Sequence, residues 1–126
     1  IENKSKNLNV ILTGYISNSD VKQLYMMNDF DLFVNMSLSE GIPVSIMEAI
    51  SFGIPIIATN VGGNAEIVND ETGVLIPVNI DQAAFNETVS DIMNKMDILK
   101  ISTILCYQNE FNADKNYHCF YNQITL

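Results

Sequence analysis

The sequence predicts an α/β domain in which a parallel sheet is flanked by helices. Short apolar runs alternate with helical segments, and after Pro77 only helical segments follow. Continuous apolar runs are typical of strands buried on both faces, as strands of parallel sheets are. Alternation of such strands with helices builds right-handed β–α–β units. The length of 126 residues and the 48% hydrophobic content suit one domain with a real core, over residues 1–126.

Four apolar runs are expected to form the strands. They lie at residues 9–13, 31–35, 55–59 and 73–77. Four parallel strands are few for a complete doubly wound domain, so either the sheet is small or its first strands precede residue 1. The chain does not begin with methionine, which favours the second explanation.

Helical spacing of apolar residues predicts the helices. Between the strands we expect helices over 20–27, 43–52 and 64–68, the first capped by Asn18 or Ser19. Beyond Pro77, one long helix over 81–99 is expected, with Asp81 as its N-cap. Further helices over 101–111 and 114–124 would close the domain, so that residues 100–126 form its C-terminal helices.

The charge of the chain excludes one large class of function. The net charge is −9, and all six basic residues are lysines. Nucleic acids and anionic membranes are bound through basic patches, so neither is expected as a partner. Any phosphate site in this chain would depend on helix N-termini and backbone N–H groups, or on residues outside the chain.

The sequence also suggests where the protein works. No apolar run reaches the roughly 18–20 residues that cross a bilayer, and the first residues do not resemble a signal peptide. Cys106 and Cys119 have no metal-ligand pattern and are expected to be free thiols in a reducing compartment, with a disulfide as the alternative. His118 has no partner pattern and is expected to be structural. A cytoplasmic location is therefore expected.

The turn after the second expected strand carries the candidate chemistry. Residues 36–43 follow that strand and lead into a helix, and ligands of open parallel sheets bind beyond the carboxyl ends of the strands. Pro43 suits the first position of a helix, and Gly41 allows the backbone to approach a ligand closely. N–H groups near residues 41–45, with the helix dipole behind them, could bind phosphate or sugar oxygens.

Two glutamates bracket this turn. Glu40 lies in it and Glu48 lies about 7–8 Å further along the helix, at 1.5 Å per residue. Carboxylates accept paired hydrogen bonds from vicinal hydroxyls, so a sugar and a ribose are suitable partners. Glu48 is flanked by apolar residues and needs a hydrogen-bonding partner. By spacing alone, a helix entrance with two chance glutamates explains the same residues.

The motifs of this region resemble those of a known enzyme family. Residues 40–63 read EGIPVSIMEAISFGIPIIATNVGG, followed by EIV at 66–68 and NDETGVL at 69–75. Upstream stand LTGYI at 12–16 and YMMNDFDLFV at 25–34. Together they closely resemble the GT4-type (group 1) glycosyltransferases of the GT-B fold, and the resemblance covers nearly the whole chain. It identifies the chain as the Rossmann-like C-terminal, donor-binding half of such an enzyme.

The resemblance implies a role for each motif residue. Glu40 would be the catalytic residue that contacts the hydroxyls of the transferred sugar, and Glu48 would bind the ribose diol. The backbone of four residues would approach the sugar and the diphosphate: Gly41, Ile42, Pro43 and Val44. Three residues would lie near the nucleotide base: Gly14, Tyr15 and Ile16.

The same resemblance implies a reaction and its requirements. Such enzymes transfer a hexosyl group from a nucleoside-diphosphate sugar to a hydroxyl and retain the anomeric configuration, with no metal and no cofactor. A front-side mechanism would use the leaving phosphate as base and leave Glu40 to orient and stabilise. Surface-polysaccharide or glycolipid assembly is the pathway implied, with any membrane contact made peripherally at the inner face through the missing domain.

The chain departs from the family at two points. The diphosphate-binding Arg and Lys of the family precede the segment where this chain starts, and Lys4 and Lys6 lack their surroundings. The N-terminal acceptor-binding domain is also missing, so the chain alone is expected to be inactive or nearly so.

Two other functions stay open at this stage. One is a GT-B relative such as a nucleotide-sugar epimerase, and the other is a non-catalytic module that holds a nucleotide. For Gly62 and Gly63 a turn and a ligand contact are equally good explanations, and Glu66 is expected to favour a helix dipole.

Overall fold

The structure is a computed structural model that describes residues 9–113 and 115. Its sheet has three parallel strands in the order β1-β2-β3, namely β1 (Phe33–Asn35), β2 (Ile56–Thr59) and β3 (Gly73–Ile76). Phe33 pairs with Ile56, and Ile56 pairs in turn with Gly73. The expected α/β fold with a parallel sheet is confirmed, and three of the four expected strands form.

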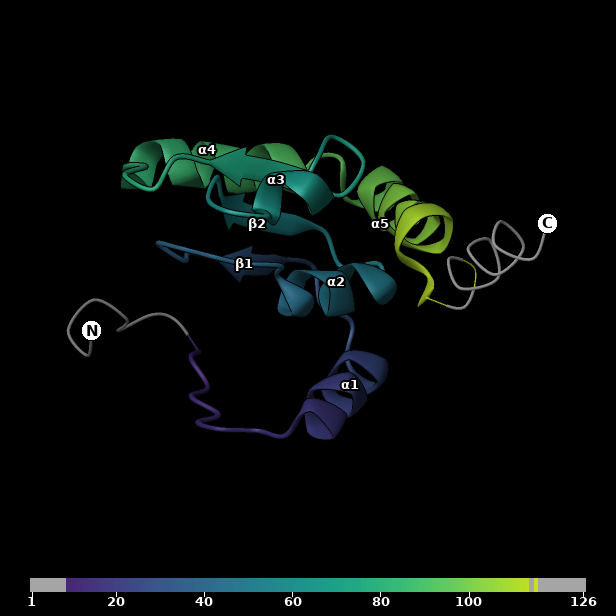
Figure 1. Ribbon diagram of the computed structural model, residues 1–126. Coiled ribbons are helices and arrows are strands. Elements are labelled where there is room, and N and C mark those ends of the chain that lie inside the picture. The colour runs from purple at the N-terminus through teal and green to yellow at the C-terminus, as the bar shows by residue number, and fades with distance from the viewer. Residues whose placement is uncertain (1–8, 114, 116–126) are drawn as a thin grey trace.

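Five α-helices and one π-helical turn surround this sheet among the described residues (Figure 1). They are α1 (Asn18–Met27), α2 (Val44–Ser51), α3 (Asn64–Ile67), α4 (Gln82–Met93), α5 (Met96–Cys106) and η1 (Tyr107–Phe111). In Figure 1, α1 lies below α2, while α4 lies at the opposite end of the molecule beside β3. The expected helix over 114–124 falls almost entirely outside the described residues.

The helix boundaries correct the sequence expectations at three places. Ser17, not Asn18 or Ser19, caps α1, because its side chain accepts a hydrogen bond from the N–H of Asp20. Asp81 caps α4 as expected and accepts from the N–H of Ala84. The single helix expected over 81–99 is two helices, broken at residues 94–95. Helix α5 and η1 share the expected helix over 101–111.

The expected strand at residues 9–13 is wrong. The segment has no strand structure, and Val10, Ile11 and Leu12 are 58%, 80% and 89% exposed. A strand needs a neighbour for its N–H and C=O groups, and among the described residues no strand lies beside this segment. Figure 1 shows it running separately from β1.

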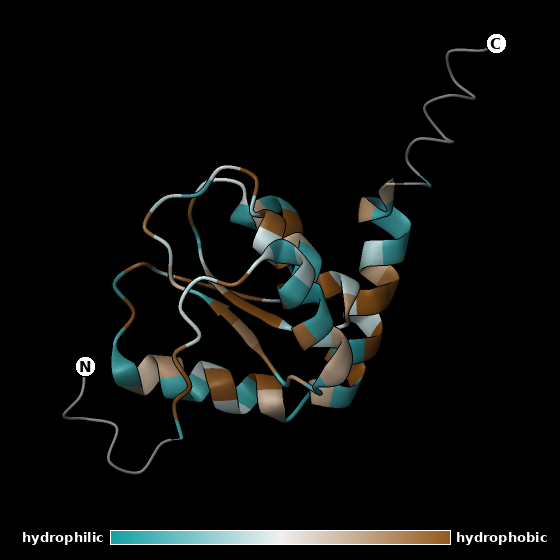
Figure 2. Ribbon diagram, turned by 90° about the horizontal axis from the view of Figure 1, so that it is seen from below, coloured by the Kyte–Doolittle hydropathy of each residue, from teal (hydrophilic) through white to brown (hydrophobic). Residues whose placement is uncertain are grey.

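The core lies on both faces of β2, the central strand. Alternate residues of a strand point to opposite faces, so Ile56 and Ala58 face α2 and α3, whereas Ile57 faces α4 and α5. On the first face Ile46 and Ile50 of α2 are fully buried. On the second face the buried partners are Ile76, Ile92 and Leu99. Figure 2 shows these hydrophobic strands between the helices.

Burial on both faces explains why β2 is a continuous apolar run. All four of its residues are buried. Each fully buried isoleucine contributes about 1.5–3 kcal/mol relative to an exposed one. The core therefore holds β2 in place, and with it the loop that follows its carboxyl end.

Candidate functional site

The candidate site is built from two loops at one edge of the sheet. Residues 36–43 follow the carboxyl end of β1 and lead into α2, and residues 60–63 follow the carboxyl end of β2 and lead into α3. Because β1 and β2 are parallel and adjacent, both loops emerge at the same edge. This is the edge at which open parallel sheets bind ligands.

The Glu40 carboxylate is already held by two side chains from its own loop and strand. The Ser37 hydroxyl donates to its Oε1 at 2.5 Å, and the Asn35 amide donates to the same oxygen at 3.1 Å. These two hydrogen bonds, Ser37 first and Asn35 second, lower the pKa of Glu40 below its ordinary value. The carboxylate is therefore ionised and oriented before any ligand arrives.

Two hydrogen bonds join the loop that carries Glu40 to the end of β2 and the loop that follows it. Thr59, at the end of β2, donates its hydroxyl proton to the carbonyl oxygen of Ser37 at 2.5 Å. The N–H of Gly63 donates to the carbonyl oxygen of Gly41 at 3.1 Å. The end of β2 and the loop after it therefore contact the turn that carries Glu40 at two points, one on each side of Glu40.

The entrance of α2 differs slightly from the expected geometry. Pro43 is the N-cap of α2, not its first helical residue, and Val44 begins the helix. The N–H of Val44 donates to the carbonyl oxygen of Ile42 at 3.0 Å, so this group is engaged within the turn. The side chains of Ile42 and Val44 are 75% and 59% exposed. Gly41 is exposed as well, which leaves this turn open to a ligand.

Glu48 is half-buried and also has a partner. Its Oε1 accepts a hydrogen bond from the amide of Asn18 in α1 at 2.6 Å. Burial, and secondarily the charge of Glu48, raises the pKa of the nearby Tyr25 phenol. Lys22, Glu48 and Tyr107 are among the residues that line a pocket of about 280 Å³ beside α2. Glu48 therefore has the partner that its apolar flanks required, and it also faces open space.

The segment Gly14, Tyr15 and Ile16 leads directly into α1 and so reaches the Glu48 side of the site. Gly14 has a φ of +62°, a conformation that favours glycine, and Tyr15 is 95% exposed. Asn18, which contacts Glu48, follows two residues after Ile16. Their role beside a nucleotide base stays a prediction.

Several residues of the site were missed by the sequence reasoning. Asn35 and Ser37 are polar residues at the end of an apolar strand, which is a signal that the sequence contains. Thr59, Asn18 and Lys22 give no such signal, because they reach the site only through the fold.

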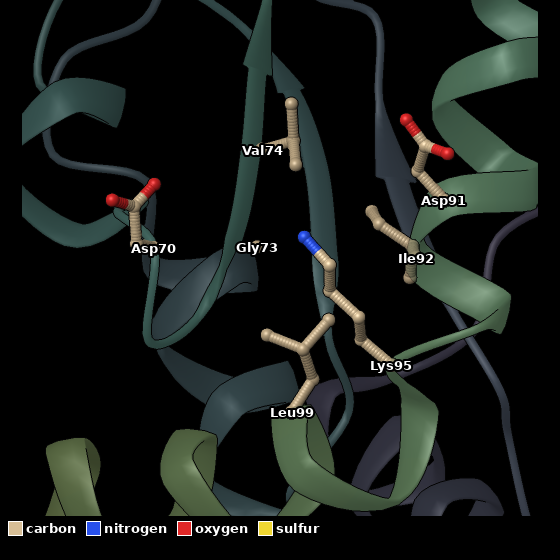
Figure 3. A pocket seen from close by; sticks show the side chains of 7 residues that line it. All are labelled: Asp70, Gly73, Val74, Asp91, Ile92, Lys95 and Leu99. Carbon is tan, nitrogen blue, oxygen red and sulfur yellow. The ribbon is translucent and has the colours of Figure 1, made fainter.

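Two further lysines that the structure describes do not serve the site: Lys100 is paired elsewhere, and Lys95 lies away from it. Lys100 forms an ion pair with Asp29 at 2.8 Å and lies 3.8 Å from Asp31. The hydrogen bond to Asp29 is the largest of the effects that raise the pKa of Lys100. Lys95 extends into a pocket of about 350 Å³ with Asp70 and Asp91 in its lining (Figure 3). That pocket lies at the amino end of β3, away from the edge that carries Glu40.

Other expected features are found only in part. Cys106 is buried with a free thiol, and burial raises its pKa, whereas Cys119 and His118 lie outside the described residues. Among residues 9–113 and 115, no cluster of three or more His, Cys, Asp or Glu side chains could hold a metal ion. Within the same residues, no helix is both long and apolar enough to span a bilayer.

The site is a turn held by two hydrogen bonds at the edge of the sheet where the parallel strands end. The sequence that forms it matches the pattern of a known family. The pattern of the glycosyl transferases group 1 covers residues 1–118, and the chain belongs to this family. This confirms the resemblance that the motifs suggested.

Individual relatives resemble parts of the chain, and two of the three below are named as glycosyl-transferring enzymes. The chain is 43% identical over 89 residues to the UDP-Gal:alpha-D-GlcNAc-diphosphoundecaprenol alpha-1,3-galactosyltransferase of Escherichia coli, covering 68% of this chain and 22% of that protein. It is 41% identical over 63 residues to protein CapJ of Staphylococcus aureus, covering 50% of this chain and 16% of that protein. To the amylovoran biosynthesis glycosyltransferase AmsK of Erwinia amylovora it is 25% identical over 122 residues, covering 91% and 29%.

A solved structure shares the fold. Sucrose-phosphate synthase from Thermosynechococcus elongatus superposes with a TM-score of 0.68 at 24% identity, over 89% of this chain and 29% of that one. The chain spans less than a third of the length of each of these relatives.

Proposed function

We propose that this chain is the donor-binding part of a retaining glycosyltransferase that moves a hexosyl group from a nucleoside-diphosphate sugar to a hydroxyl acceptor. The observation that carries the proposal is the pair of glutamates around the entrance of α2. Glu40 and Glu48 each hold a hydrogen bond from a neutral side chain, which orients the carboxylate and leaves its charge intact. Such carboxylates suit the diols of a sugar and a ribose.

In this proposal the bond changes are simple. The bond between the anomeric carbon and the diphosphate oxygen breaks, and its electron pair leaves with the diphosphate. The acceptor oxygen forms the new bond to that carbon from the same side, and its proton passes to the departing phosphate oxygen. Glu40 accepts hydrogen bonds from the sugar hydroxyls and stabilises the positive charge that develops on the ring. No metal and no cofactor takes part.

The ligand would lie along the turn. Glu48 would bind the ribose, and the segment Gly14–Ile16 that leads to Asn18 would place the base on that side. The backbone of residues 41–44 would lie against the sugar and diphosphate. The chain has no arginine, and Lys22 lies beside Glu48 on the ribose side of the proposed site, so we propose that the cation for the diphosphate comes from elsewhere in the protein.

Other strands and another domain would complete the enzyme. Among the described residues no strand pairs with the outer edge of β1, and the apolar run at residues 10–12 is exposed, as expected if neighbouring strands belong to a further part of the protein. An acceptor-binding domain would face the site across the crevice. The names of the relatives suggest synthesis of a surface polysaccharide or glycolipid, by a cytoplasmic enzyme whose membrane contact, if any, lies in that domain.

Binding of the donor can be tested directly. We expect the chain to bind a UDP or GDP sugar weakly in calorimetry or ligand-observed NMR across a panel of nucleotide sugars. Glu48→Gln should weaken binding about tenfold, because it removes one charged acceptor of the ribose diol. Glu87→Gln, an exposed glutamate of α4, is the matched control. Equal binding by both variants would remove the ribose role of Glu48.

Turnover tests the role of Glu40. In the full enzyme, Glu40→Gln should lower kcat by about 10²-fold, the scale of losing one preorganised electrostatic group, with little change in nucleotide affinity. Unchanged turnover would contradict the proposed contact with the transferred sugar.

A further inference from the structure

We propose that the end of β2 and the loop after it position Glu40 for the reaction, and that Thr59, Gly62 and Gly63 are the positioning residues. The inference rests on the proposed function, in which Glu40 orients the transferred sugar. None of the three residues needs to touch the ligand, because each acts on the turn that carries Glu40.

The first link runs through side chains. Thr59 is 1% exposed at the end of the central strand, and its hydroxyl donates to the carbonyl oxygen of Ser37. Ser37 in turn donates to the Glu40 carboxylate at 2.5 Å. Two consecutive hydrogen bonds therefore connect the buried core strand to Oε1 of Glu40. Rotation of Glu40 away from its position would break the second of these bonds.

The second link runs through the backbone. Gly62 has a φ of +51°, and a Cβ atom there would lie 1.8 Å from the carbonyl oxygen of Glu40. A Cβ atom on Gly63 would lie 2.5 Å from the carbonyl oxygen of Gly41. Both contacts are with backbone atoms, which cannot rotate out of the way as a flexible side chain can. Only glycine allows the two loops to approach this closely.

The loop itself is anchored from below. Asn64 is fully buried, and its amide donates to the carbonyl oxygen of Thr59 at 2.8 Å, closing the loop at its base. The N–H of Asn64 also donates to the carbonyl oxygen of Val61 at 3.2 Å. A short loop held by these hydrogen bonds is rigid, and the turn that carries Glu40 packs against it.

Rigidity of this kind matters for group transfer. A misplacement of about 1 Å at a reacting centre can cost about 10²-fold in rate. Side chains of a site stay within about 0.5 Å of their productive position only when a supporting shell holds them. Thr59 at the end of β2 supports one side of Glu40, and the loop after β2 supports the other.

A double-mutant cycle in the full enzyme tests the inference. Thr59→Val removes the hydroxyl at nearly constant shape and should lower kcat about tenfold, with a small change in donor KM. In the Glu40→Gln background it should have little further effect, because its influence passes through Glu40. Thr72→Val is the matched control, since Thr72 is also fully buried and donates to a backbone carbonyl, that of Ile67.

A comparison of two glycine substitutions gives a second, independent test of the inference. Gly62→Ala should lower kcat more than Gly53→Ala at equal fractions of folded protein. Gly53 lies just beyond the C-terminal end of α2, away from the Glu40 turn, and also has a positive φ, of +73°. A Cβ atom there would meet the side chain of Ile104. Both substitutions strain the backbone, so thermal stability is measured for each. Only Gly62→Ala displaces the Glu40 turn.

A third readout does not depend on turnover. The carboxyl carbon of Glu40, followed by NMR through a pH titration, should show a higher pKa in Thr59→Val than in Thr72→Val, because a displaced Ser37 supports the carboxylate less well. The inference would be overturned if Thr59→Val lowered kcat by the same factor in the wild-type and Glu40→Gln backgrounds and also left the pKa of Glu40 unchanged. If instead Glu40→Gln alone leaves turnover intact, the proposed function of Glu40 fails, which is a separate outcome.

Discussion

Glu40 combines solvent access with a fixed orientation. Its carboxylate accepts two hydrogen bonds at one oxygen, from Ser37 and Asn35, and the second oxygen is not used by either. Both donors favour the ionised form, which is why the pKa of Glu40 lies below its ordinary value. The residue is thereby prepared to accept further hydrogen bonds at the remaining oxygen.

The pH dependence of this residue follows from the sign of its pKa shift. The pKa of Glu40 is lower in the folded than in the unfolded protein. The hydrogen bonds to its carboxylate therefore stabilise the folded state above the unfolded pKa, and this stabilisation is lost as pH falls through the folded pKa. Ser37→Ala removes the larger cause. We expect the Glu40 titration, and with it the acid limb of the kcat profile, to move to higher pH. Ser39→Ala, in the same turn, should leave both unchanged.

Some features at this scale could be predicted from the sequence and some could not. Glu40 and Glu48 could be singled out because their spacing around a Gly-x-Pro turn is local. The contact of Gly62 with Glu40 joins residues 22 positions apart, and no local pattern reports it. The exposure of the run at residues 9–13 was missed for a related reason. Its composition predicts a strand, but strand formation depends on a neighbour that the described residues do not supply.

At the scale of elements, capping residues determine where the helices begin. Ser17 and Asp81 each place a side-chain oxygen on an N–H of the first turn, of α1 and α4 respectively. The apolar periodicity of 81–99 predicted one helix, whereas the structure bends at residues 94–95. The bend lets Ile92 of α4 and Leu99 of α5 both reach the same face of the sheet.

The cap of α4 makes a quantitative prediction. Asp81→Ala should lower the free energy of unfolding by about 1 kcal/mol, because the N–H of Ala84 loses its acceptor. In a domain of this size the melting temperature should fall by about 3–5 °C, which calorimetry or circular dichroism can measure. Asp81→Asn keeps an acceptor at the same place and should cost much less. An equal loss in both variants would contradict the capping role.

At the scale of the whole molecule, the sheet divides the core into two clusters, and the central strand β2 contributes buried residues to both. Ile46 and Ile50 lie on one side, and Ile76 and Ile92 on the other. The turn that carries Glu40 follows β1, beside this central strand, and the loop at residues 60–63 follows β2 itself. The site is therefore attached to the most buried part of the protein, although its own residues lie near the surface.

The outer edge of β1, with which no described strand pairs, has a consequence for the colloidal behaviour of the chain. Consecutive residues of a strand direct their N–H and C=O groups to opposite edges, so the groups of Val34 point away from β2. Such an edge can add a strand from another copy, and β1 contains neither the lysine nor the proline that often prevents this. A net charge of −9 opposes that encounter, over a distance that shrinks to about 10 Å in 0.1 M salt.

Salt should therefore promote self-association of the 126-residue chain. We expect light scattering and sedimentation to show larger species as sodium chloride is raised, and Val34→Lys to suppress them by placing a charge on the edge strand. Ile98→Lys, at an exposed residue of helix α5, is the matched control, because it adds the same charge away from both edges of the sheet, and it should associate like the wild type. A chain that stays monomeric in high salt would show that its edge is already protected, and that charge repulsion is not what keeps the copies apart.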